Sequence, residues 1–412
     1  MEALGRLNQA PKKPYNLIIE KRICKVFMIP RTAIPLLEEI RSGYPVITIT
    51  GPRQSGKTTL ARSVFSDKPY ISLETPDARE FARSDPRGFM ARWKNGAIID
   101  EVQHVPELFS WIQTDVDAVG KMGRFILTGS QNFSLIANIT QSLAGRSALV
   151  QLLPLSIAEL SSAGSLPNSL DEMILHGGYP ALYSRTLNPA RWLADYTMSY
   201  LERDVRQITQ VQDLTTFQRF LRLCAGRTGQ LLNMSSLAQD AGISQSTAKS
   251  WISILQASYI VFLLPPHHRN LGKRLVKMPK LYFQDTGLAA SLMGIQTAKQ
   301  LSIHPLRGAL FETLIVGEHL KSRFNQGFPS NLYFWRDNVG LEVDLLLDEP
   351  EGLVPIEIKS SATVSESLLK GLRRWLKAAE NDTQQPRLIC DSGENYVQSG
   401  IDIRRWQDAI RL

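Results

Sequence analysis

The alternation of apolar and polar positions divides the chain into stretches with different secondary-structure signals. A helical pattern over residues 32–42 is followed by short apolar, often β-branched runs that predict buried strands at 46–50, 70–73, 97–100, 124–128 and 148–153. Helical segments, the first at residues 58–65, separate these strands. Strands that alternate with helices favour a parallel sheet covered on both faces. We therefore expect an N-terminal extension at residues 1–30 and an α/β domain at residues 31–155.

Beyond residue 155 the pattern is helical and then changes twice. Residues 156–215 predict a helical lid, interrupted by Gly177-Gly178-Tyr179-Pro180. Residues 216–285 predict a smaller helical unit that ends in a strand at 259–264. From Gly308 the order is helix, three strands, helix and strand. This order predicts a second α/β domain, to which we assign residues 286–412.

Composition narrows the class of protein. The chain has 412 residues, of which 43% are hydrophobic and 21% charged, as is typical of globular proteins, and its net charge of +8 favours a polyanionic partner. The cysteines, Cys24, Cys224 and Cys390, lie too far apart for a disulfide framework or a paired metal-ligand motif. No apolar run approaches the roughly 20 residues that span a bilayer. We expect a cytoplasmic protein with no membrane partner.

The first predicted strand runs directly into a phosphate-binding motif. Residues 51–58 match G-x-x-x-x-G-K-[ST] in full, between a strand and a helix. Its glycines allow backbone N–H groups to surround phosphates, Lys57 would reach the β- and γ-phosphates, and Thr58 would hold Mg²⁺. The expected cofactors are ATP and Mg²⁺. The expected nucleotide-binding residues are Gly51, Pro52, Arg53, Gln54, Ser55, Gly56, Lys57, Thr58, Thr59 and Ser130.

Acidic and polar side chains follow the later strands of this domain. Asp100 ends the third strand and is expected to bind the metal, and Glu101 would polarise the attacking water as a general base. A polar side chain after the fourth strand, Ser130 or Asn132, would orient that water. Arg146 immediately precedes the fifth strand, where an arginine can reach the γ-phosphate of a neighbouring subunit. An ordinary surface arginine is the alternative for Arg146, because a finger in trans requires a homo-oligomer.

The order of these motifs resembles the AAA-type ATPases. Residues 49–59, Ile99-Asp100-Glu101-Val102-Gln103 and Leu127-Thr128-Gly129-Ser130 are similar to one prokaryotic branch of that family, as are residues 200–205 and 282–288. The resemblance covers roughly residues 30–380. It implies an AAA-type core, a winged helix and a nuclease-like C-terminal domain. Gly177-Gly178-Tyr179-Pro180 resembles an element of related ATPases near the nucleotide, and an ordinary turn between helices is the alternative.

The middle of the chain predicts a helix-turn-helix. Gly242 supplies the turn between two helical segments and Ser244 would cap the second one. Small polar residues face outward on the second helix, and a basic segment at residues 266–280 follows, as in the wing of a winged helix. Packing or protein contact is the alternative to DNA binding. The expected DNA contacts are Gln245, Lys249, Arg269, Lys273, Arg274 and Lys277.

The C-terminal domain carries the residue spacing of PD-(D/E)xK nucleases. Asp344 lies on one predicted strand and Glu357 and Lys359 lie on the same face of the next. Their alternation with apolar residues places them where core residues would otherwise stand, and inward charges cost free energy unless they bind something. Asp344 and Glu357 would bind Mg²⁺, with Glu312 as a further metal-site group, and Lys359 would orient a water. The aromatic run Tyr333-Phe334-Trp335 is interpreted as strand core rather than as a base-stacking surface.

These observations predict an enzyme: an ATPase that couples hydrolysis in a homo-oligomer to DNA binding or remodelling. Cleavage of DNA by Glu357, Asp344 and Lys359, with branched DNA as one substrate, is an additional activity that the spacing allows. The alternative is a nucleotide-controlled regulatory or defence switch whose nuclease-like domain does not cleave.

Overall fold

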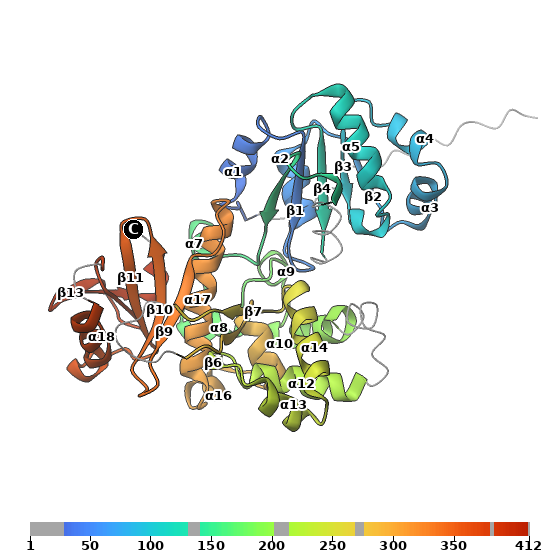
Figure 1. Cartoon of the computed structure of the whole chain (residues 1–412). Helices are drawn as coiled ribbons and strands as arrows, with labels where there is room; N and C mark the ends of the chain where they lie inside the picture. The colour runs from blue at the N-terminus through green and yellow to red at the C-terminus, as the bar shows by residue number, and fades with distance from the viewer. Residues whose placement is uncertain (1–28, 131–140, 202–213, 268–275, 380–382, 411–412) are drawn as a thin grey trace, which may run out of the picture.

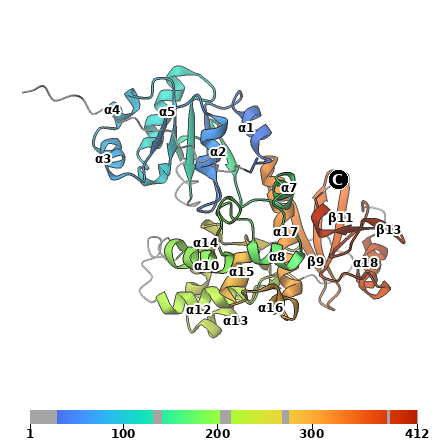
Figure 2. The same cartoon turned by 180° about the vertical axis from the view of Figure 1, so that it is seen from behind.

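The structure is built around three β-sheets. The computed structural model describes residues 29–130, 141–201, 214–267, 276–379 and 383–410. Figure 1 shows a five-stranded sheet with its helices at the top, a largely helical unit below it, and a six-stranded sheet to one side. Figure 2 shows the same three parts from behind. A small three-stranded sheet lies within the helical unit.

The first sheet is parallel, as the sequence pattern predicts. Its strands are β1 (Val46–Thr50), β2 (Tyr70–Ser72), β3 (Ala97–Asp100), β4 (Phe125–Gly129) and β5 (Ser147–Gln151), in the order β2-β3-β4-β1-β5. Alternate strand residues face two separate apolar cores. One core contains α4 (Pro86–Ala91) and α5 (Leu108–Val119), together with α3 (Pro76–Ser84), and the other contains α1 (Ile34–Ile40) and α2 (Lys57–Val64). Helices therefore cover both faces of the sheet, and the carboxyl ends of β1 and β3 meet at one edge.

The central unit consists of short helices around one extended apolar core. Its first helices are α7 (Ile157–Ser162), α8 (Leu170–His176), α9 (Ala181–Ser184) and α10 (Pro189–Tyr196), followed by a π-helical turn η2 (Thr197–Leu201). The later elements are α12 (Leu214–Ala225), β6 (Gln230–Leu231), α13 (Met234–Ala241), α14 (Gln245–Ala257), β7 (Val261–Leu264), β8 (Lys280–Phe283), α15 (Thr286–Leu292) and α16 (Ala298–Ser302). The antiparallel sheet has the order β6-β8-β7.

The turn between α13 and α14 has the predicted chemistry. Gly242 ends α13 in the left-handed conformation, with φ of 71°, and Ser244 caps α14 by accepting a hydrogen bond from the backbone N–H of Thr247 at 3.1 Å. Ala248 and Ile252 are buried, so α14 packs one side against the unit. The predicted order of helix, glycine turn and capped helix is therefore present in this segment.

Asp285 connects the start of α15 to the turn after α8. Its carboxylate caps α15 through the backbone N–H of Leu288 and also accepts the N–H of Gly178 at 2.7 Å. A Cβ at Gly177 would lie 2.2 Å from an Asp285 oxygen, and a Cβ at Gly178 would lie 2.4 Å from the carbonyl oxygen of Leu155. The Gly-Gly pair is therefore required by close packing, because a side chain at either position would displace the buried carboxylate or the backbone.

The C-terminal sheet has six strands, and the two that carry Asp344, Glu357 and Lys359 lie inside it, with other strands on both sides. The six strands are β9 (Leu332–Arg336), β10 (Glu342–Glu349), β11 (Gly352–Lys359), β12 (Arg387–Cys390), β13 (Tyr396–Gln398) and β14 (Ile401–Arg405), in the order β13-β14-β12-β11-β10-β9. Helix α17 (Arg307–Asn325) packs on the face that shows Val354 and Ile356, and α18 (Glu366–Ala379) packs on the other face against Leu388 and Cys390. Phe334 and Trp335 are fully buried, which confirms their interpretation as strand core.

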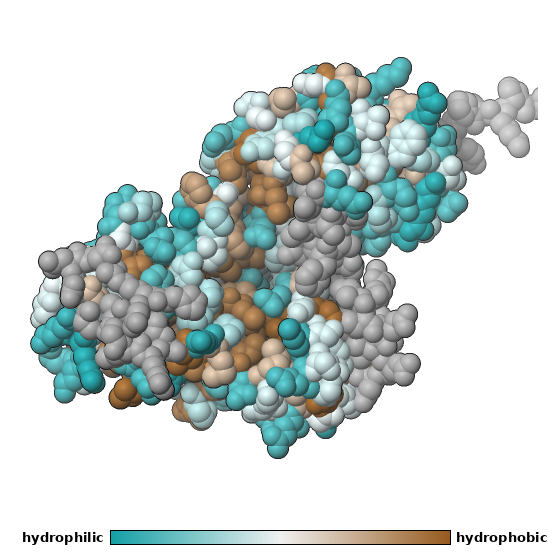
Figure 3. Space-filling model, in the orientation of Figure 1, coloured by the Kyte–Doolittle hydropathy of each residue, from teal (hydrophilic) through white to brown (hydrophobic). Residues whose placement is uncertain are grey.

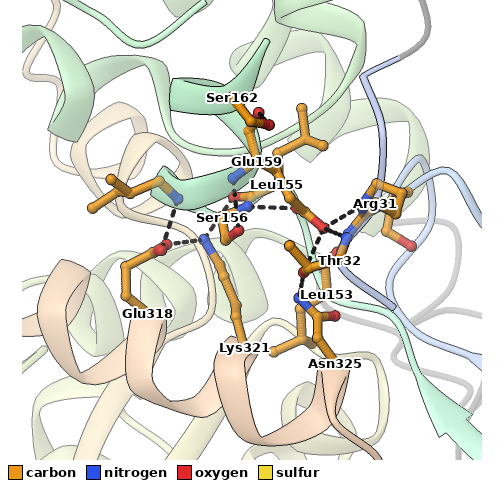
Figure 4. A network of polar contacts seen from close by, with 12 residues as sticks. Arg31, Thr32, Leu153, Leu155, Ser156, Glu159, Ser162, Glu318, Lys321 and Asn325 are labelled. Atoms are coloured by element: carbon orange, nitrogen blue, oxygen red, sulfur yellow. Dashed lines mark hydrogen bonds and ion pairs between the residues drawn. The ribbon is translucent and has the colours of Figure 1, made fainter. Parts of the chain in front are cut away.

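A buried polar network joins the first sheet to α17. Glu159 of α7 accepts hydrogen bonds from Arg31 Nε at 3.0 Å and from the backbone N–H groups of Thr32 and Ser156 at 2.7 and 2.8 Å. On α17, Lys321 donates to the carbonyl oxygen of Leu155 at 2.9 Å and pairs with Glu318. Figure 4 shows these side chains converging from the N-terminal segment, α7 and α17. The network fixes α17 against the part of the molecule that carries the first sheet.

The distribution of apolar residues on the surface follows the division into the upper sheet and the helical unit below it. In the view of Figure 3, apolar residues gather in the hollow between the upper sheet and the helices below it, and the outer faces are mostly hydrophilic. Within the described ranges, no helix is both long enough and apolar enough to cross a membrane.

Replacing Glu159 by Gln tests the network. The variant leaves the buried guanidinium of Arg31 without its anion, so we expect a loss of about 3 kcal/mol in the free energy of unfolding at neutral pH. Burial raises the pKa of Glu159, but Arg31 and the N–H donors outweigh it and hold that pKa below its usual range. The unfolded state thus binds more protons, and the stabilisation is lost as pH falls from about 4 through the folded pKa.

Urea denaturation across the acid range measures this difference. The gap between wild type and Glu159→Gln should close at low pH. Glu38→Gln, an exposed change on α1, should alter stability by less than about 0.5 kcal/mol. Equal stability of Glu159→Gln and wild type at neutral pH would contradict the role of the pair.

Candidate nucleotide site and C-terminal acid cluster

The phosphate-binding loop lies between β1 and α2. Gly51 has φ of 147°, and a Cβ there would lie 2.1 Å from the carbonyl oxygen of Leu152, so only glycine can stand at this position. Gly56 has φ of 94° and directly precedes α2, which begins at Lys57. The loop therefore turns back tightly and directs the first N–H groups of α2 into the space where phosphates bind such motifs.

Lys57 and Thr58 already have polar partners in this loop. Lys57 Nζ donates to the carbonyl oxygens of Gly51 and Pro52 at 3.0 and 2.8 Å. Thr58 Oγ1 donates to Asp100 Oδ1 at 2.7 Å. A hydroxyl and a carboxylate thus lie side by side at the sheet edge, which is the donor set that Mg²⁺ prefers.

Asp100 is held by three hydroxyl groups. Besides Thr58, Tyr70 Oη donates to Asp100 Oδ2 at 2.9 Å, and Thr128 Oγ1 donates to Oδ1. Burial and the nearby Asp100 raise the pKa of Tyr70 to about 12, so its hydroxyl stays protonated. Tyr70 and Thr128 were not predicted as site residues. The sequence feature that could have identified them is their position, since both lie on strands that pair with β3.

Glu101 has an unusual backbone conformation and two side-chain donors. Its φ of 53° is left-handed, which is rare for a residue other than glycine and is often found where a site requires it. Ser130 Oγ donates to Glu101 Oε2 at 3.0 Å, and Gln103 Nε2 donates to the same oxygen. Asn132, the alternative to Ser130, lies outside the described residues. Burial raises the pKa of Glu101, but Lys57 and the donor Gln103 lower it below its usual range. Glu101 is therefore a fixed carboxylate that can accept a proton.

A cavity of ≈ 420 Å³ brings these residues together. This volume is in the range of small-molecule sites. It is lined by the predicted residues Arg53, Gln54, Gly56, Lys57, Thr58, Thr59, Asp100 and Glu101, and by the additional residues Glu74, Pro180, Ala181, Ser184 and Arg185. The turn at Gly177–Pro180 thus lies beside the loop. A second, apolar cavity of ≈ 110 Å³ shares Gly56, Thr59, Pro180 and Ser184 with it and extends to Ile29, Ile34 and Leu60.

Arg146 lies at the other end of the sheet. Its carbonyl oxygen accepts the N–H of Val46, at the start of β1, whereas the phosphate-binding loop follows the end of that strand. Its guanidinium forms a two-point pair with Asp117 on the surface, with the longer contact at 2.9 Å. The fold therefore does not bring Arg146 to the loop of its own chain.

The C-terminal domain brings Asp344, Glu357 and Lys359 together. Lys359 Nζ lies 2.9 Å from Asp344 Oδ2 and 2.6 Å from Glu357 Oε1. The backbone N–H of Ile358 also donates to Asp344. Burial and the neighbouring Asp344 raise the pKa of Glu357 to about 8, and Glu357 Oε2 is buried without a hydrogen-bond partner. The pair of acids thus shares one cation, and one oxygen is left unsatisfied.

Glu312 belongs to an adjoining cluster that includes Lys280. Lys280 Nζ lies 2.8 Å from Glu312 Oε1 and also pairs with Glu342, and its side chain is only 3% exposed. Tyr282 Oη donates to the same oxygen of Glu312 at 2.5 Å. The sequence pattern predicts Lys280 in an exposed basic wing. The structure instead buries it, because β8 is the middle strand of its small sheet and packs against α17.

These two clusters do not form a metal site in this arrangement. Among the described residues, no three acidic, histidine or cysteine side chains lie close enough together to hold a metal ion. Two lysines, Lys280 and Lys359, instead pair with the carboxylates of Glu312, Glu342, Asp344 and Glu357 and offset part of their charge. A metal at this position would have to displace at least one ammonium group.

The predicted DNA contacts are partly described. Gln245 and Lys249 are exposed on α14, and Lys277 is exposed before β8. Arg269, Lys273 and Arg274 lie outside the described residues, as do residues 202–205 of a motif that carries the family resemblance. The exposed side of α14 is therefore available to a partner.

One family match covers the ATP-binding loop and the sheet around it. The sequence profile of the AAA domain family matches residues 43–161, and two domains of unknown function, DUF8612 and DUF4143, match residues 167–299 and 307–406. The uncharacterized proteins Mb2031c of Mycobacterium bovis and Rv2008c of Mycobacterium tuberculosis are each 32% identical over 378 residues, or 91% of this chain and 82% of theirs. The Walker-type ATPase paby2304 of Pyrococcus abyssi is 16% identical with a TM-score of 0.44, over 65% of this chain and 99% of that one.

Lys280→Met tests the pairing of Lys280 with Glu312 and Glu342. The change leaves Glu312 and Glu342 without their buried cation, so we expect a loss of about 3–5 kcal/mol in stability at neutral pH. Burial already raises the pKa of Glu312, and removing Lys280, which lowers it, should raise it further. A raised pKa in the folded state makes stability fall as pH rises. The deficit of the variant should therefore shrink toward acid pH.

Chemical denaturation at several pH values measures this deficit. Lys299→Met, an exposed change on α16, is the matched control and should have little effect. A deficit that is absent, or that does not change with pH, would show that Lys280 is not the partner of these acids.

Proposed function

The chain belongs to the same family as the mycobacterial proteins Mb2031c and Rv2008c and is an AAA-type P-loop ATPase, and from this premise we propose that it couples ATP hydrolysis to the binding or remodelling of DNA. The observation that supports the ATPase part most directly is the convergence of Lys57, Thr58 and Glu101 on one cavity. The DNA-binding part is supported by the exposed polar face of α14, which carries Lys249, and by the net charge of +8.

In the proposed site each polar residue has a separate role. Lys57 would leave the carbonyl oxygens of Gly51 and Pro52 for the phosphates, which offer a full negative charge in place of two dipoles. Thr58 and Asp100 would hold Mg²⁺, which screens the phosphate charge when it is bound. Glu101, positioned by Ser130 and Gln103, would accept a proton from the attacking water.

The rest of the nucleotide has a place beside the phosphates. The apolar cavity that continues from the loop is bounded by Ile29 and Ile34 on one side and by Leu60 of α2 on another. We assign it to the adenine base, because a flat apolar ring favours such walls. Pro180 borders both cavities, so the segment after α8 would sense whether a nucleotide is present.

Arg146 would act in a neighbouring subunit. Its position at the opposite end of the sheet from its own loop favours a role in another chain, and its pair with Asp117 lies at the surface, where such pairs contribute little stability and could be exchanged for a phosphate. This assignment requires a homo-oligomer. The central unit would act as a winged helix, with α14 as its DNA-contacting helix and the β6-β8-β7 sheet behind it.

For the C-terminal domain, the geometry favours the non-cleaving alternative over DNA hydrolysis. The residues of the PD-(D/E)xK spacing are close together, as a nuclease-like fold requires, but Lys359 already pairs with Asp344 and Glu357, and Lys280 pairs with Glu312. We therefore propose a nuclease-like domain that binds without cutting, attached to a nucleotide-controlled ATPase. DNA cleavage would need a rearrangement that withdraws Lys280.

Glu101→Gln separates ATP binding from hydrolysis. The amide keeps the shape of the side chain but cannot take a proton, so we expect turnover to fall about 100-fold or more with little change in ATP affinity. Phosphate release measures turnover, and a fluorescent ATP analogue measures binding. Lys57→Ala should lose both. Glu107→Gln, exposed at the start of α5, is the matched control, and normal turnover in Glu101→Gln would disprove the assigned mechanism.

DNA binding is tested by its dependence on salt. Removing one lysine that pairs with a DNA phosphate should reduce the slope of log affinity against log salt by about 0.9. We expect Lys249→Ala and Lys277→Ala each to reduce the slope for a labelled duplex by about this amount. Lys121→Ala, exposed in the ATPase domain, should leave it unchanged. An affinity that does not vary with salt, or the same slope in all variants, would count against DNA contact by this unit.

A further inference from the structure

The C-terminal domain contains a separate polar cavity, which is not lined by Asp344, Glu357 or Lys359. It has a volume of ≈ 310 Å³ and is bordered by α17 and by the ends of β9, β10, β11 and β12. One side of the cavity is formed by α17 and the turn after it, through His319, Ser322, Arg323 and Gln326. These positions are three, one and three residues apart, so they share a face of the helix. The polar lining includes His319, Ser322, Arg323, Gln326, Glu349 and Arg387.

Several buried polar atoms in and beside this cavity have no partner. His319 is only 6% exposed, and its Nε2 atom is buried without a hydrogen bond, as are Arg387 Nε and Arg404 Nη1. In the part of the chain that the structure describes, Arg387 has no ion pair. Burying donors without partners costs free energy, and natural folds rarely leave several such atoms in one place. Three of them together indicate that something else binds there.

The charge around these atoms is positive. Arg387 and Arg404 stand on the paired strands β12 and β14, where Arg387 lies opposite Asp402, two residues before Arg404. Arg404 uses its Nε to bind Asp402 at 2.6 Å, which leaves Nη1 unused. Burial and the two arginines lower the pKa of His319 to about 3, so the ring is neutral and can donate or accept. Burial and the neighbouring Arg404 also lower the pKa of Arg387.

Carboxylates near the cavity offset part of this charge. Glu349 accepts a hydrogen bond from Asn331 at 3.0 Å and lies 3.9 Å from Arg323, and Glu349 and Asp402 also partly offset the charge of Arg387. Glu351 also lines the cavity and is solvent-exposed. The cavity lining therefore combines arginine donors with acids and amides, among them Glu349 and Gln384, that accept hydrogen bonds from hydroxyl groups.

We propose that this cavity binds the phosphate group of a phosphorylated ligand, with Arg387 and His319 of its lining as donors and with the charge of the neighbouring Arg404 beside them. Arginine presents planar N–H groups that match phosphate oxygens, and a dianion would relieve the repulsion between the two guanidinium groups. Two sources share this chemistry: a small phosphorylated metabolite, whose hydroxyl groups Glu349 and Gln384 would bind, and the terminal phosphate of a nucleic-acid strand. The site is separate from the ATP site and does not depend on its assignment.

Isothermal titration calorimetry on the full chain tests the proposal. The protein carries Lys57→Ala to weaken phosphate binding at the nucleotide loop. The probes are inorganic phosphate, AMP, and one short oligonucleotide with and without a 5′-phosphate. We expect a second variant, Arg387→Gln, to weaken binding of the phosphate-bearing probes about tenfold or more, since charged hydrogen bonds contribute about 1.5–3 kcal/mol. Arg374→Gln, an exposed arginine on α18, is the matched control.

The pattern of binding decides the outcome. Binding of AMP or inorganic phosphate indicates a small ligand, and a preference for the 5′-phosphorylated oligonucleotide indicates a strand end. Absence of binding by every probe, or equal affinity in Arg387→Gln and Arg374→Gln, overturns the proposal. If Arg387→Gln does not fold, His319→Gln replaces it, since a neutral side chain of similar polarity should fold and still lose affinity.

Discussion

The arrangement of the molecule depends on one buried ion pair, between Arg31 and Glu159. Both side chains are almost fully withdrawn from water, at 7% and 0% exposure. Charges at such positions are tolerated only when every hydrogen-bonding group has a partner. Arg31 meets this condition by also donating to the carbonyl oxygens of Ser55 at 2.8 Å and Leu153 at 2.6 Å. The pair therefore holds the phosphate-binding loop, the exit from β5 and the start of α7 in one fixed geometry (Figure 4).

Helix α17 extends this constraint to the rest of the chain. Asn325 donates a hydrogen bond to Thr32, and Glu318 accepts one from the backbone N–H of Ile157. These bonds connect the C-terminal half of α17 to the ATPase domain and the start of α7. The N-terminal half of α17 carries Glu312, which pairs with Lys280 of β8. One rigid element thus contacts all three parts of the molecule. A displacement of the loop by a nucleotide would have to carry α17 with it or break the buried pair.

The two acidic sites differ in what balances their charge. In the ATPase domain, neutral hydroxyl groups of Thr58, Thr128 and Tyr70 hold Asp100, so its negative charge remains to attract a cation. In the C-terminal domain, the charges of Asp344 and Glu312 are already met by Lys359 and Lys280. The acidic residues at strand ends therefore differ between the two domains: in the first a carboxylate is held by neutral groups, and in the second each is paired with a lysine.

The sequence by itself determined the features that depend on local patterns. The parallel sheet, the phosphate-binding loop and the helix-turn-helix followed from apolar periodicity and from glycines such as Gly51 and Gly242, whose conformations few other residues adopt. The pairing of Asp344 with Glu357 followed from the period of two along neighbouring strands. Only the tertiary structure decided the surroundings of Arg31, Lys280 and His319. Arg31 meets Glu159 across 128 residues and Lys280 meets Glu312 across 32, and the strands beside His319 pair in an order that the sequence does not specify. Lys280 shows the reason: a basic residue in a basic segment is expected to be exposed, and burial reversed its role once β8 packed against α17.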